Sequence, residues 1–376
     1  MPANVLGERF SITSFGESHG KCIGTVVDGC PAGLKLNEKD VQPLLDLRRP
    51  GQSIITTQRK EIDKVSIISG VFNGYTTGAP ICLLIWNTDA DSRSYEEIRH
   101  TPRPGHSDYP AYLKYGGFAD YRGSGRFSGR LTATIVMGGA IALKILSQYL
   151  NIKIISYTKS IGNVTCDTEN MSFDELSEKR YLNEVRCPDI DSAVKMRNNI
   201  LSARKNGDSL GGVIECITNS VPPGLGEPIF ESIESELSKG LFSIPAVKGV
   251  EFGSGFMGST IRGSQNNDTF YIEKTSGKIL TTTNNSGGIL GGITNGMPLK
   301  FRIALKPAAS ISMTQKTINI EKRSETDLQI KGRHDPCVVP RAPPVVDSVV
   351  AIILLDQCIK CNLISPVLKE QYDENK

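Results

Sequence analysis

The residues of this chain that are best suited to chemistry gather at positions 102–130, which read PRPGHSDYPAYLKYGGFADYRGSGRFSGR. This stretch contains His106, four arginines, one lysine and six glycines. Guanidinium groups bind carboxylates and phosphates through paired hydrogen bonds, and glycine lets the backbone come close to a ligand. The stretch therefore predicts a site for an anionic ligand. A solvated loop rich in Arg and Gly, or one that binds nucleic-acid phosphates, is the alternative that this composition leaves open.

The apolar run that follows, LTATIVMGGAIALKILSQYL at positions 131–150, predicts a long helix that Ser128 or Thr132 can start. A hydroxyl at that position accepts a hydrogen bond from an unpaired amide of the first turn. The amides and the dipole at a helix start attract anions. We therefore expect the start of this helix to contribute to the same anion site.

Three of the four histidines, His19, His106 and His334, stand in turns rich in Gly, Pro or Asp, which favours exposure at a site. Histidine titrates near neutral pH and is the commonest general acid or base. A structural or solvated histidine is the competing interpretation at each position. No HExxH motif and no pair of CxxC motifs accompanies them, so the sequence predicts no metal site.

Two further segments could offer backbone amides and hydroxyls to a phosphate. They are KPAAS at positions 306–310 and TTTNNSGGILGG at positions 281–292. Neither has the GxxxxGK[ST] pattern of a P-loop, and GSGFMG at positions 253–258 misses the dinucleotide-binding fingerprint. Nucleotide binding by these two geometries is therefore disfavoured.

Two parts of the chain resemble each other. PAGL at positions 31–34 and PPGL at positions 222–225 each follow a β-rich run and precede a helical pattern. Later in each part, with equal spacing, Gly70, Gly74, Gly78 and Pro80 match Gly288, Gly292, Gly296 and Pro298. We interpret this as an internal duplication within one domain covering 1–376, with related α/β halves at about 10–150 and 205–360. Coincidence is the alternative, since the chain holds 37 glycines.

Composition limits the class of protein. The chain has 376 residues, 39% hydrophobic residues and a net charge of only +3, which exclude the strongly basic field of a dedicated nucleic-acid binder. Its start lacks the features of a signal peptide, and its longest apolar run, around 345–355, is too short to span a bilayer. The nine cysteines form no paired metal or redox pattern. We expect a reduced cytoplasmic enzyme or binding protein, without nucleic-acid or membrane partners.

Several motifs, taken in order, resemble those of chorismate synthase: GESHG with IGTVVDGCPAG, RRPGQS, RPGHSDY, GRFSGR, SIPAVKGVEFG, NNSGGILGGITNG, KPAAS and GRHDPC. They extend over about 16–346, nearly the whole chain. The resemblance implies a carbon-oxygen lyase that converts 5-enolpyruvylshikimate 3-phosphate to chorismate and phosphate by anti-1,4-elimination, the last step of the shikimate pathway. It also implies a need for reduced FMN and assembly as a homotetramer. The implied fold is an α/β (α+β) sandwich of two pseudo-symmetric halves, with sheets in the core and helices outside.

The resemblance also implies roles for single residues. His106 is expected to protonate the reduced flavin, His19 to act as an acid near the departing phosphate, and Asp335 to work with the flavin in removing the ring proton. The candidates for substrate binding are Ser18, Arg48 and Arg130. The candidates for FMN binding are Arg126, Phe127, Ser128, Gly291, Lys306, Pro307, Ala308, Ala309, Ser310 and Arg333. NADPH is expected only as a source of reducing equivalents.

This chain departs from the pattern that many family members show. They read GRSSARET where this chain reads GRFSGRLT, so Phe127, Gly129 and Leu131 replace a serine, an alanine and a glutamate. Hydrogen bonds from the replaced side chains must therefore be absent here.

A second departure follows RRPGQS, where Ile54 and Ile55 stand in place of a further arginine. The contact of that arginine with substrate or NADPH is either absent here or supplied elsewhere, with Arg59 as the candidate. His334 is interpreted as a neighbour of Asp335 and not as a catalyst. Two other functions stay open at this point. The chain could be a non-catalytic binder of phosphate-rich polymers, or a bifunctional form that reduces flavin with NADPH itself.

Overall fold

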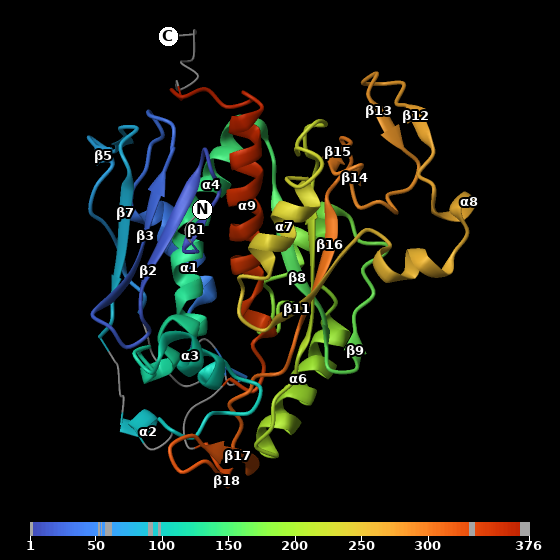
Figure 1. Ribbon diagram of the computed structural model, residues 1–376. Coiled ribbons are helices and arrows are strands. Elements are labelled where there is room, and N and C mark those ends of the chain that lie inside the picture. Colours follow the sequence, from blue (N-terminus) through green and yellow to red (C-terminus); the bar gives the residue numbers. More distant parts are fainter. Residues whose placement is uncertain are drawn as a thin grey trace.

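The computed structural model describes residues 3–51, 53, 55–56, 62–88, 93–96, 99–330 and 335–368. Two five-stranded sheets enclose a layer of helices (Figure 1). Neighbouring strands within both sheets run antiparallel. The chain therefore has a mixed α/β fold, which confirms the predicted fold class.

Each sheet comes from one part of the chain. The first sheet has the order β1 (Val5–Leu6), β2 (Ser11–Gly16), β3 (Cys22–Asp28), β7 (Ile81–Trp86), β4 (Val65–Ile67). The second has the order β9 (Val164–Thr165), β8 (Ile154–Ile161), β10 (Gly212–Thr218), β16 (Lys300–Leu305), β11 (Val247–Phe252). Along β7, Ile81, Leu83 and Ile85 are buried on one face. Such alternation gives a sheet one apolar face that another layer must cover.

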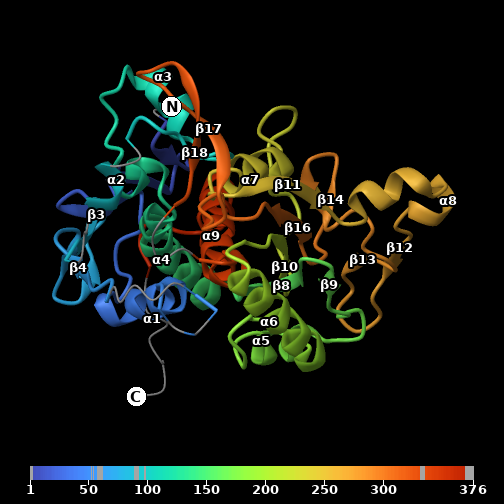
Figure 2. The same cartoon turned by 90° about the horizontal axis from the view of Figure 1, so that it is seen from below.

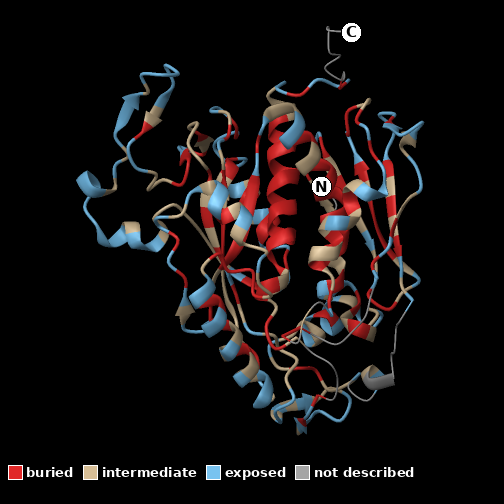
Figure 3. Ribbon diagram, turned by 180° about the vertical axis from the view of Figure 1, so that it is seen from behind, coloured by how far each residue is buried: buried red, intermediate tan, exposed pale blue. Residues whose placement is uncertain are grey.

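Four helices fill the space between the sheets: α1 (Glu38–Arg48), α4 (Thr132–Leu150), α7 (Ile233–Leu241) and α9 (Pro343–Lys360). Seen from below, α4 and α9 lie side by side, with α4 against β3 and α9 against β8 (Figure 2). α9 is buried from Pro343 to Cys358 (Figure 3). A Cβ at Gly139 of α4 would overlap Ser348 of α9, so this glycine permits the two helices to approach closely.

The expected order of layers is wrong. Sheets were predicted in the core with helices outside, but α4 and α9 form the core and the sheets lie on either side of them. An antiparallel sheet can leave one face to water, whereas a helix that is apolar all round must be covered on every side. α4 with the turn before it is long and apolar enough to cross a membrane, yet 67% of its most apolar part is buried inside the fold. It is a core helix.

Shorter elements surround this framework. The helices are α2 (Arg93–Glu96), α3 (Asp108–Tyr115), α5 (Phe173–Lys179), α6 (Ile190–Lys205) and α8 (Gly263–Asn266). The hairpins are β5 (Val71–Phe72) with β6 (Tyr75–Thr76), β12 (Phe270–Ile272) with β13 (Ile279–Thr281), β14 (Ile289–Leu290) with β15 (Ile293–Thr294), and β17 (Gln315–Asn319) with β18 (Ser324–Leu328). α3 and the β17–β18 hairpin lie at one end of the molecule, and α8 with the β12–β13 hairpin forms an arm beside the second sheet (Figure 1).

The two sheets follow the same plan. Four neighbouring strands of each sheet are arranged alike: β2, β3, β7 and β4 in the first sheet, and β8, β10, β16 and β11 in the second. In both sets these are the first, second, fourth and third strands in chain order. α1 follows β3 as α7 follows β10. The matching glycines share a left-handed backbone, with φ values of 81°, 81° and 84° at Gly70, Gly74 and Gly78 and 85°, 85° and 92° at Gly288, Gly292 and Gly296. Glycine adopts this conformation without the strain that a side chain would bring.

A buried threonine closes the equivalent turn in each half. Thr76 donates from Oγ1 to the carbonyl of Pro31 (2.7 Å) and accepts from the amide of Leu34 (2.9 Å). In the other half, Thr294 Oγ1 donates to the Pro222 carbonyl (2.7 Å) and accepts from the Leu225 amide (2.9 Å). The PAGL and PPGL motifs are therefore held by the same pair of bonds.

Candidate active site

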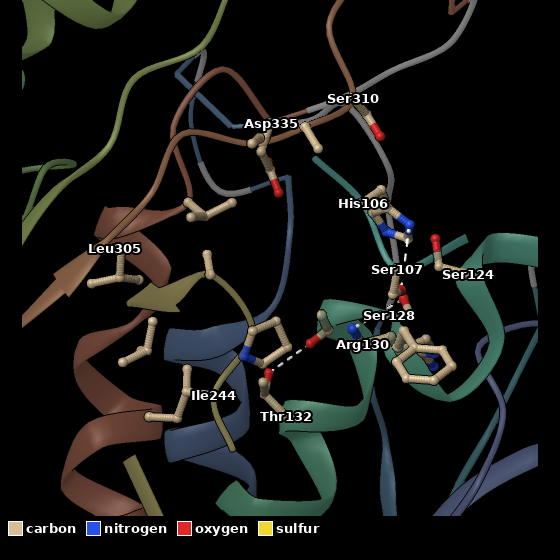
Figure 4. Close-up of a pocket in the computed structure, with 18 of the residues that line it drawn as sticks. His106, Ser107, Ser124, Ser128, Arg130, Thr132, Ile244, Leu305, Ser310 and Asp335 are labelled. Carbon is tan, nitrogen blue, oxygen red and sulfur yellow. Dashed lines mark hydrogen bonds between the residues drawn. The ribbon is translucent and has the colours of Figure 1, made fainter. Parts of the chain in front are cut away.

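A cavity of about 690 Å³ opens where the starts of α4 and α9 come together. Its wall includes segments 103–107, 123–130, 242–248, 305–310 and 335–345. Figure 4 places His106, Ser310 and Asp335 towards one end and Thr132, Ile244 and Leu305 towards the other. The volume lies within the range of sites that bind small molecules and cofactors.

Positive charge dominates the described lining of this cavity. Its cationic side chains are Arg48, Arg103, Arg126, Arg130, Lys248, Lys306 and Arg341. Asp335 is the acidic residue among the described lining residues. Walls of low dielectric constant that carry one sign of charge concentrate ligands of the opposite sign. The cavity is therefore suited to a ligand with several negative charges.

Arg48 and Arg130 share a carboxylate, that of Asp63, whose side chain is 0% exposed. Nη1 of Arg48 lies 3.1 Å from Asp63 Oδ2, and Nη1 of Arg130 lies 2.7 Å from Oδ1. Arg48 also donates from Nε to Thr132 Oγ1 (2.9 Å) and from Nη2 to the Gly129 carbonyl (2.6 Å). Burial raises the pKa of Asp63, but the two guanidinium groups outweigh burial and hold this pKa below its usual range. Asp63 thus fixes both arginines and leaves one net positive charge at the wall.

Local structure explains where these two arginines stand. Arg48 is the last residue of α1, which begins with a capping box formed by Asn37 and Asp40. Arg130 lies in the 3₁₀ turn Gly129–Leu131, where Ser128 Oγ accepts from the Arg130 amide at 3.3 Å. This turn leads directly into α4. Ser128 therefore begins the helical segment, as the sequence predicts, and both substrate-binding candidates line the cavity.

His106 lies at the wall in the loop before α3. Its Nδ1 is 2.7 Å from Oδ1 of Asp108, the first residue of α3. Arg103 donates to the same carboxylate from Nε and Nη2, both at 2.7 Å. The Arg103 guanidinium also reaches Ser310 Oγ (3.0 Å) and Ser124 Oγ (2.8 Å). This buried arginine therefore ties three segments of the wall together.

The wall opposite Arg103 is a strained turn. Gly123, Ser124 and Gly125 have φ values of 57°, 70° and 52° in succession. A serine rarely adopts this region, so two flanking glycines and the bond from Arg103 are needed to hold Ser124 there. The amide of Ser18 donates to the Gly125 carbonyl at 3.2 Å. This bond brings the turn with His19 against the outside of the cavity wall.

His19 is buried directly behind the wall. A Cβ at Gly123 would overlap the His19 ring, so the bare glycine backbone separates the imidazole from the cavity. The ring packs edge-on against Tyr95 with 5.3 Å between centroids, and Tyr95 and Gly123 both line the cavity. Ser18 is buried beside Gly123, and its Oγ has no hydrogen-bond partner among the residues that the structure describes. Both residues thus lie one layer behind the lining.

Asp335 lines the cavity and forms an ion pair with Arg341. Arg341 also donates from Nε to the backbone carbonyl of Arg48 at 3.2 Å. It stands in the 3₁₀ turn Val339–Arg341, two residues before α9, just as Arg130 stands two residues before α4. Each core helix therefore begins beside an arginine that is paired with a carboxylate and lines the cavity.

Most residues predicted to bind FMN line the cavity: Arg126, Phe127, Ser128, Lys306, Pro307, Ala308, Ala309 and Ser310. The guanidinium of Arg126 lies 5.9 Å from the centroid of the Tyr115 ring and donates to Asn4. Lys306 donates from Nζ to the carbonyl of Gly105, beside His106. The Phe127 ring tilts against Tyr115, with 6.4 Å between centroids. The phenyl group that replaces a serine thus adds apolar surface to the wall.

Gly291 does not line this cavity. It stands in the turn between β14 and β15, away from the end of the molecule where α3 and the β17–β18 hairpin lie (Figure 1). Its contact with a cofactor stays a prediction. Arg333, His334, Ile54 and Arg59, which also carry sequence-based expectations, lie outside the described residues.

Four residues that shape the site have no individual role in the sequence prediction: Arg103, which counts there only as one of the arginines of 102–130, Asp108, Asp63 and Arg341. The first two flank His106 in RPGHSD, and an aspartate two positions after a histidine in a turn is a signal that could have indicated a pair. Asp63 lies 15 and 67 positions from the arginines that it binds. Only folding brings these three side chains together, so no local pattern reveals the cluster.

These features define the class of protein. An imidazole, a carboxylate and several fixed cations surround one cavity of cofactor size, and a rigid framework of two sheets and buried helices positions them. This is the construction of an enzyme that acts on a small anionic molecule.

Comparison with known proteins gives the family. The model of the chorismate synthase family matches residues 10–359. The chorismate synthase of Dehalococcoides mccartyi (strain BAV1) is 50% identical over 368 residues, covering 98% of this chain and 100% of that protein, and that of Korarchaeum cryptofilum is 51% identical over 360 residues, covering 96% and 98%. A crystal structure of chorismate synthase matches with a TM-score of 0.74 at 30% identity, covering 94% of this chain and 93% of that one. The chain therefore belongs to the chorismate synthase family, the lyases of the shikimate pathway.

Proposed function

We propose that the chain converts 5-enolpyruvylshikimate 3-phosphate to chorismate and phosphate by anti-1,4-elimination in the cavity lined by His106 and Asp335. The observation that carries this proposal is the positive charge of the cavity lining. The substrate has two carboxylates and a phosphate, and the described lining offers seven cationic side chains against one acidic one. Paired hydrogen bonds from guanidinium groups are the strongest means of holding such groups against water.

The arginines that Asp63 fixes are the proposed substrate-binding groups. Arg48 and Arg130 keep their positions before a ligand arrives, because a buried carboxylate and backbone carbonyls already orient them. Cations held in this way cost little reorganisation when negative charge develops beside them. We include Ser18 with them, because its buried Oγ lies next to the Gly123 wall.

The elimination needs an acceptor for the ring proton and a donor near the departing phosphate. We assign the first role to Asp335, whose carboxylate lines the cavity and is oriented by Arg341. We assign the second to His19, whose ring lies one layer behind the lining, next to the bare backbone of Gly123. His106 lines the cavity and is proposed to transfer a proton there, with its Nδ1 held by Asp108.

The residues present fit reduced FMN. Phe127, Ile244 and Leu305 give the cavity apolar wall, while Arg126 and Lys306 offer cations to a phosphate. We propose that the cofactor is held by Arg126, Phe127, Ser128, Lys306, Pro307, Ala308, Ala309 and Ser310, with Arg333. When bound, reduced FMN supplies an electron-rich ring that stabilises the charge developing as phosphate leaves. We propose that reduced flavin comes from elsewhere, with NADPH only as the source of reducing equivalents, so NADPH consumption by the purified protein alone would contradict this part of the proposal.

We further propose a homotetramer in the cytoplasm. The arm that carries α8 and β12–β13 exposes large apolar side chains, among them Phe256 (82% exposed), Phe270 (61%) and Ile272 (68%). Large exposed apolar side chains that gather on one arm are typical of a protein interface, and a second copy of the chain would cover them. Sedimentation velocity tests the assembly, and a single species with the mass of one chain would contradict it.

The two halves of the chain, at about 10–150 and 205–360, are proposed to derive from an internal duplication within one domain. The equal strand order of the two sheets supports this. So do the equal hydrogen bonds of Thr76 and Thr294 and the equal backbone conformation of the glycines in the two hairpins.

An anaerobic assay with 5-enolpyruvylshikimate 3-phosphate tests the proposed reaction. We expect equal amounts of chorismate and phosphate when reduced FMN is present, and neither product with oxidised FMN or without flavin. Absence of product with reduced FMN, from a protein whose circular dichroism shows that it is folded, would contradict the proposed function. Salt-dependent binding of RNA without affinity for reduced flavin would instead favour a binder of phosphate polymers.

A further inference from the structure

We propose that Asp108 is a positioning residue that keeps the proton of the neutral His106 ring on Nδ1 and so presents an unprotonated Nε2 to the cavity. This inference rests on the proposed role of His106 in proton transfer. Asp108 opens α3, and its side chain is 27% exposed beside the 20% exposed side chain of His106. His106 lines the cavity and Asp108 does not, so Asp108 acts through the imidazole and not by contact with a ligand.

The assignment of the proton follows from counting donors. Nη2 of Arg103 carries two hydrogens, and both have acceptors: Oδ1 of Asp108 at 2.7 Å and Oγ of Ser124 at 2.8 Å. Nη2 also lies 3.1 Å from Nδ1 of His106, but it has no hydrogen left to donate there. An ionised carboxylate can only accept, and Ser107 Oγ lies farther from Nδ1, at 3.5 Å, so the 2.7 Å contact between Nδ1 and Asp108 is a bond that Nδ1 donates.

Asp108 also sets the charge beside the ring. Burial raises the pKa of Asp108, but hydrogen bonds from Arg103 and His106 outweigh burial and hold this pKa well below its usual range. The carboxylate is therefore ionised throughout the pH range in which histidine titrates. It offsets the charge of Arg103, whose side chain is only 4% exposed and would otherwise oppose a protonated imidazole at 3.1 Å.

Charges from other parts of the chain also face this region. Lys306 reaches the carbonyl of Gly105, next to His106, and Arg126 lines the same cavity. Asp335 and Arg341 line it as an ion pair that carries no net charge. Asp108 is thus the carboxylate in contact with the imidazole among the described residues.

The arrangement lets a proton enter and leave at one nitrogen without movement of the ring. Nδ1 donates to Asp108 in both protonation states, so the ring orientation is kept. Nε2 carries the lone pair when His106 is neutral and the mobile proton when it is charged. The same histidine can therefore give and take a proton on the cavity side.

Nitrogen-15 NMR of the histidine rings tests the tautomer without any cofactor. The chain has four histidines, and a His106→Gln variant identifies the signal of interest. At about pH 8.5, where an unperturbed imidazole is neutral, we expect a protonated Nδ1 in the wild type. In Asp108→Ala, the freed hydrogen of Arg103 Nη2 can bond to Nδ1, so we expect the proton to move to Nε2. A protonated Nε2 in the wild type, or no change in Asp108→Ala, would overturn the inference.

Asp108→Asn keeps an oxygen that can accept from Nδ1 but removes the negative charge, together with the acceptor that the amide and Nε of Arg103 use. We expect turnover to fall about 10- to 100-fold, as for other groups that orient a functional histidine. We also expect the limb of the pH profile that requires a protonated group to move to lower pH by about one unit or more, because Arg103 is no longer offset.

Asp40→Asn is the matched control. Asp40 also lies in the first turn of a helix, does not line the cavity, is 25% exposed and forms an ion pair at 2.7 Å, but its partner is Lys144 and not a histidine of the cavity wall. The pH profile of turnover of Asp40→Asn should not shift. Loss of turnover in Asp108→Asn without a shift of the profile would mean a structural role and would overturn the inference. A wild-type protein that forms no chorismate contradicts the proposed reaction instead, and the NMR result for the ring stands apart from it.

Discussion

The two halves of the chain are alike in their framework and unlike at the cavity. The turns closed by Thr76 and Thr294 have the same bonds to within 0.1 Å, and the strand orders correspond. In their described residues, the connections that lead into the core helices, 87–131 and 306–342, share a 3₁₀ turn with an arginine two residues before the helix and otherwise differ in their elements. The first connection brings the imidazole of His106 to the cavity and the second brings the carboxylate of Asp335, while His19 lies in the turn between β2 and β3 behind the wall. The proposed function thus assigns chemistry mainly to the connections and stability to the framework, which is the usual division between loops and sheets.

The carboxylates that pair with these two arginines show the same contrast. Asp63, which binds Arg130, has a side chain that is 0% exposed, while Asp335, which binds Arg341, is 12% exposed and lines the cavity. A fully buried carboxylate between two guanidinium groups supports the fold. One at a cavity wall can also meet a ligand. The following variants test this difference.

The largest effect is expected where each half supplies its reacting group. His106→Ala and Asp335→Asn should each lower turnover by about 10²- to 10⁴-fold, because each removes a proposed proton-transfer group. Anaerobic turnover with reduced FMN measures the loss, and the melting temperature should change little. His100→Ala is the control, since His100 pairs with Glu321 and does not line the cavity. Full activity in either cavity variant would show that the halves do not share the chemistry.

Stability should respond in the opposite way. Asp63→Ala leaves two buried guanidinium groups without their carboxylate and should lower the free energy of unfolding by about 3–5 kcal/mol. Asp335→Ala should cost about 1 kcal/mol, because water in the cavity can solvate Arg341. Urea unfolding measures both, with Asp327→Ala of the exposed pair to Lys316 as a control near zero. Equal losses of unfolding free energy in Asp63→Ala and Asp335→Ala would show that the two carboxylates contribute alike to stability.

The pH dependence of stability is a second test of the role of Asp63 in the fold. The pKa of Asp63 is lower in the folded chain than in the unfolded one, so pairing stabilises the fold fully above the unfolded value of about 3.9. This contribution is lost as the pH falls through the lower folded value. The wild type should therefore lose stability on acidification below about pH 4 more steeply than Asp63→Asn, as measured by urea midpoints. Parallel curves would contradict the role of Asp63.

A smaller effect is expected on substrate binding. Arg130→Ala and Arg341→Ala should each raise the KM for the substrate by about 10- to 100-fold, because each removes a charge-assisted hydrogen bond. Steady-state kinetics measure the change. Arg122→Ala is the control, since Arg122 pairs with Asp120 and does not line the cavity. A raised KM in Arg130→Ala alone would indicate that the first half, and not the second, binds the substrate.

The smallest effect should be equal in the two halves. Thr76→Val and Thr294→Val each leave a buried amide and a buried carbonyl without their partner, at a cost of about 1–3 kcal/mol. The two losses in urea unfolding should agree within about 0.5 kcal/mol. A difference larger than this would show that the matching turns do not contribute alike.

Local chemistry in the sequence predicted much of the site. The segment 102–130, rich in arginine and glycine, does contribute to the wall of a cationic cavity. The equally spaced glycines at 70–78 and 288–296 do mark equivalent hairpins. The layer order could not be predicted, because the apolar runs of α4 and α9 show that they are buried but not between which neighbours. Asp63 was missed since its partners are distant in the chain. Gly291 was assigned from a motif that the fold places away from the cavity.

The paired arginine turns at Arg130 and Arg341 have a consequence for how such a site could diversify. In an assembly of two separate identical halves, every substitution would occur at both positions and the site would keep twofold symmetry. Joined in one polypeptide, as the proposed duplication implies, each copy mutates independently. A substrate without symmetry can then meet imidazole on one flank and carboxylate on the other.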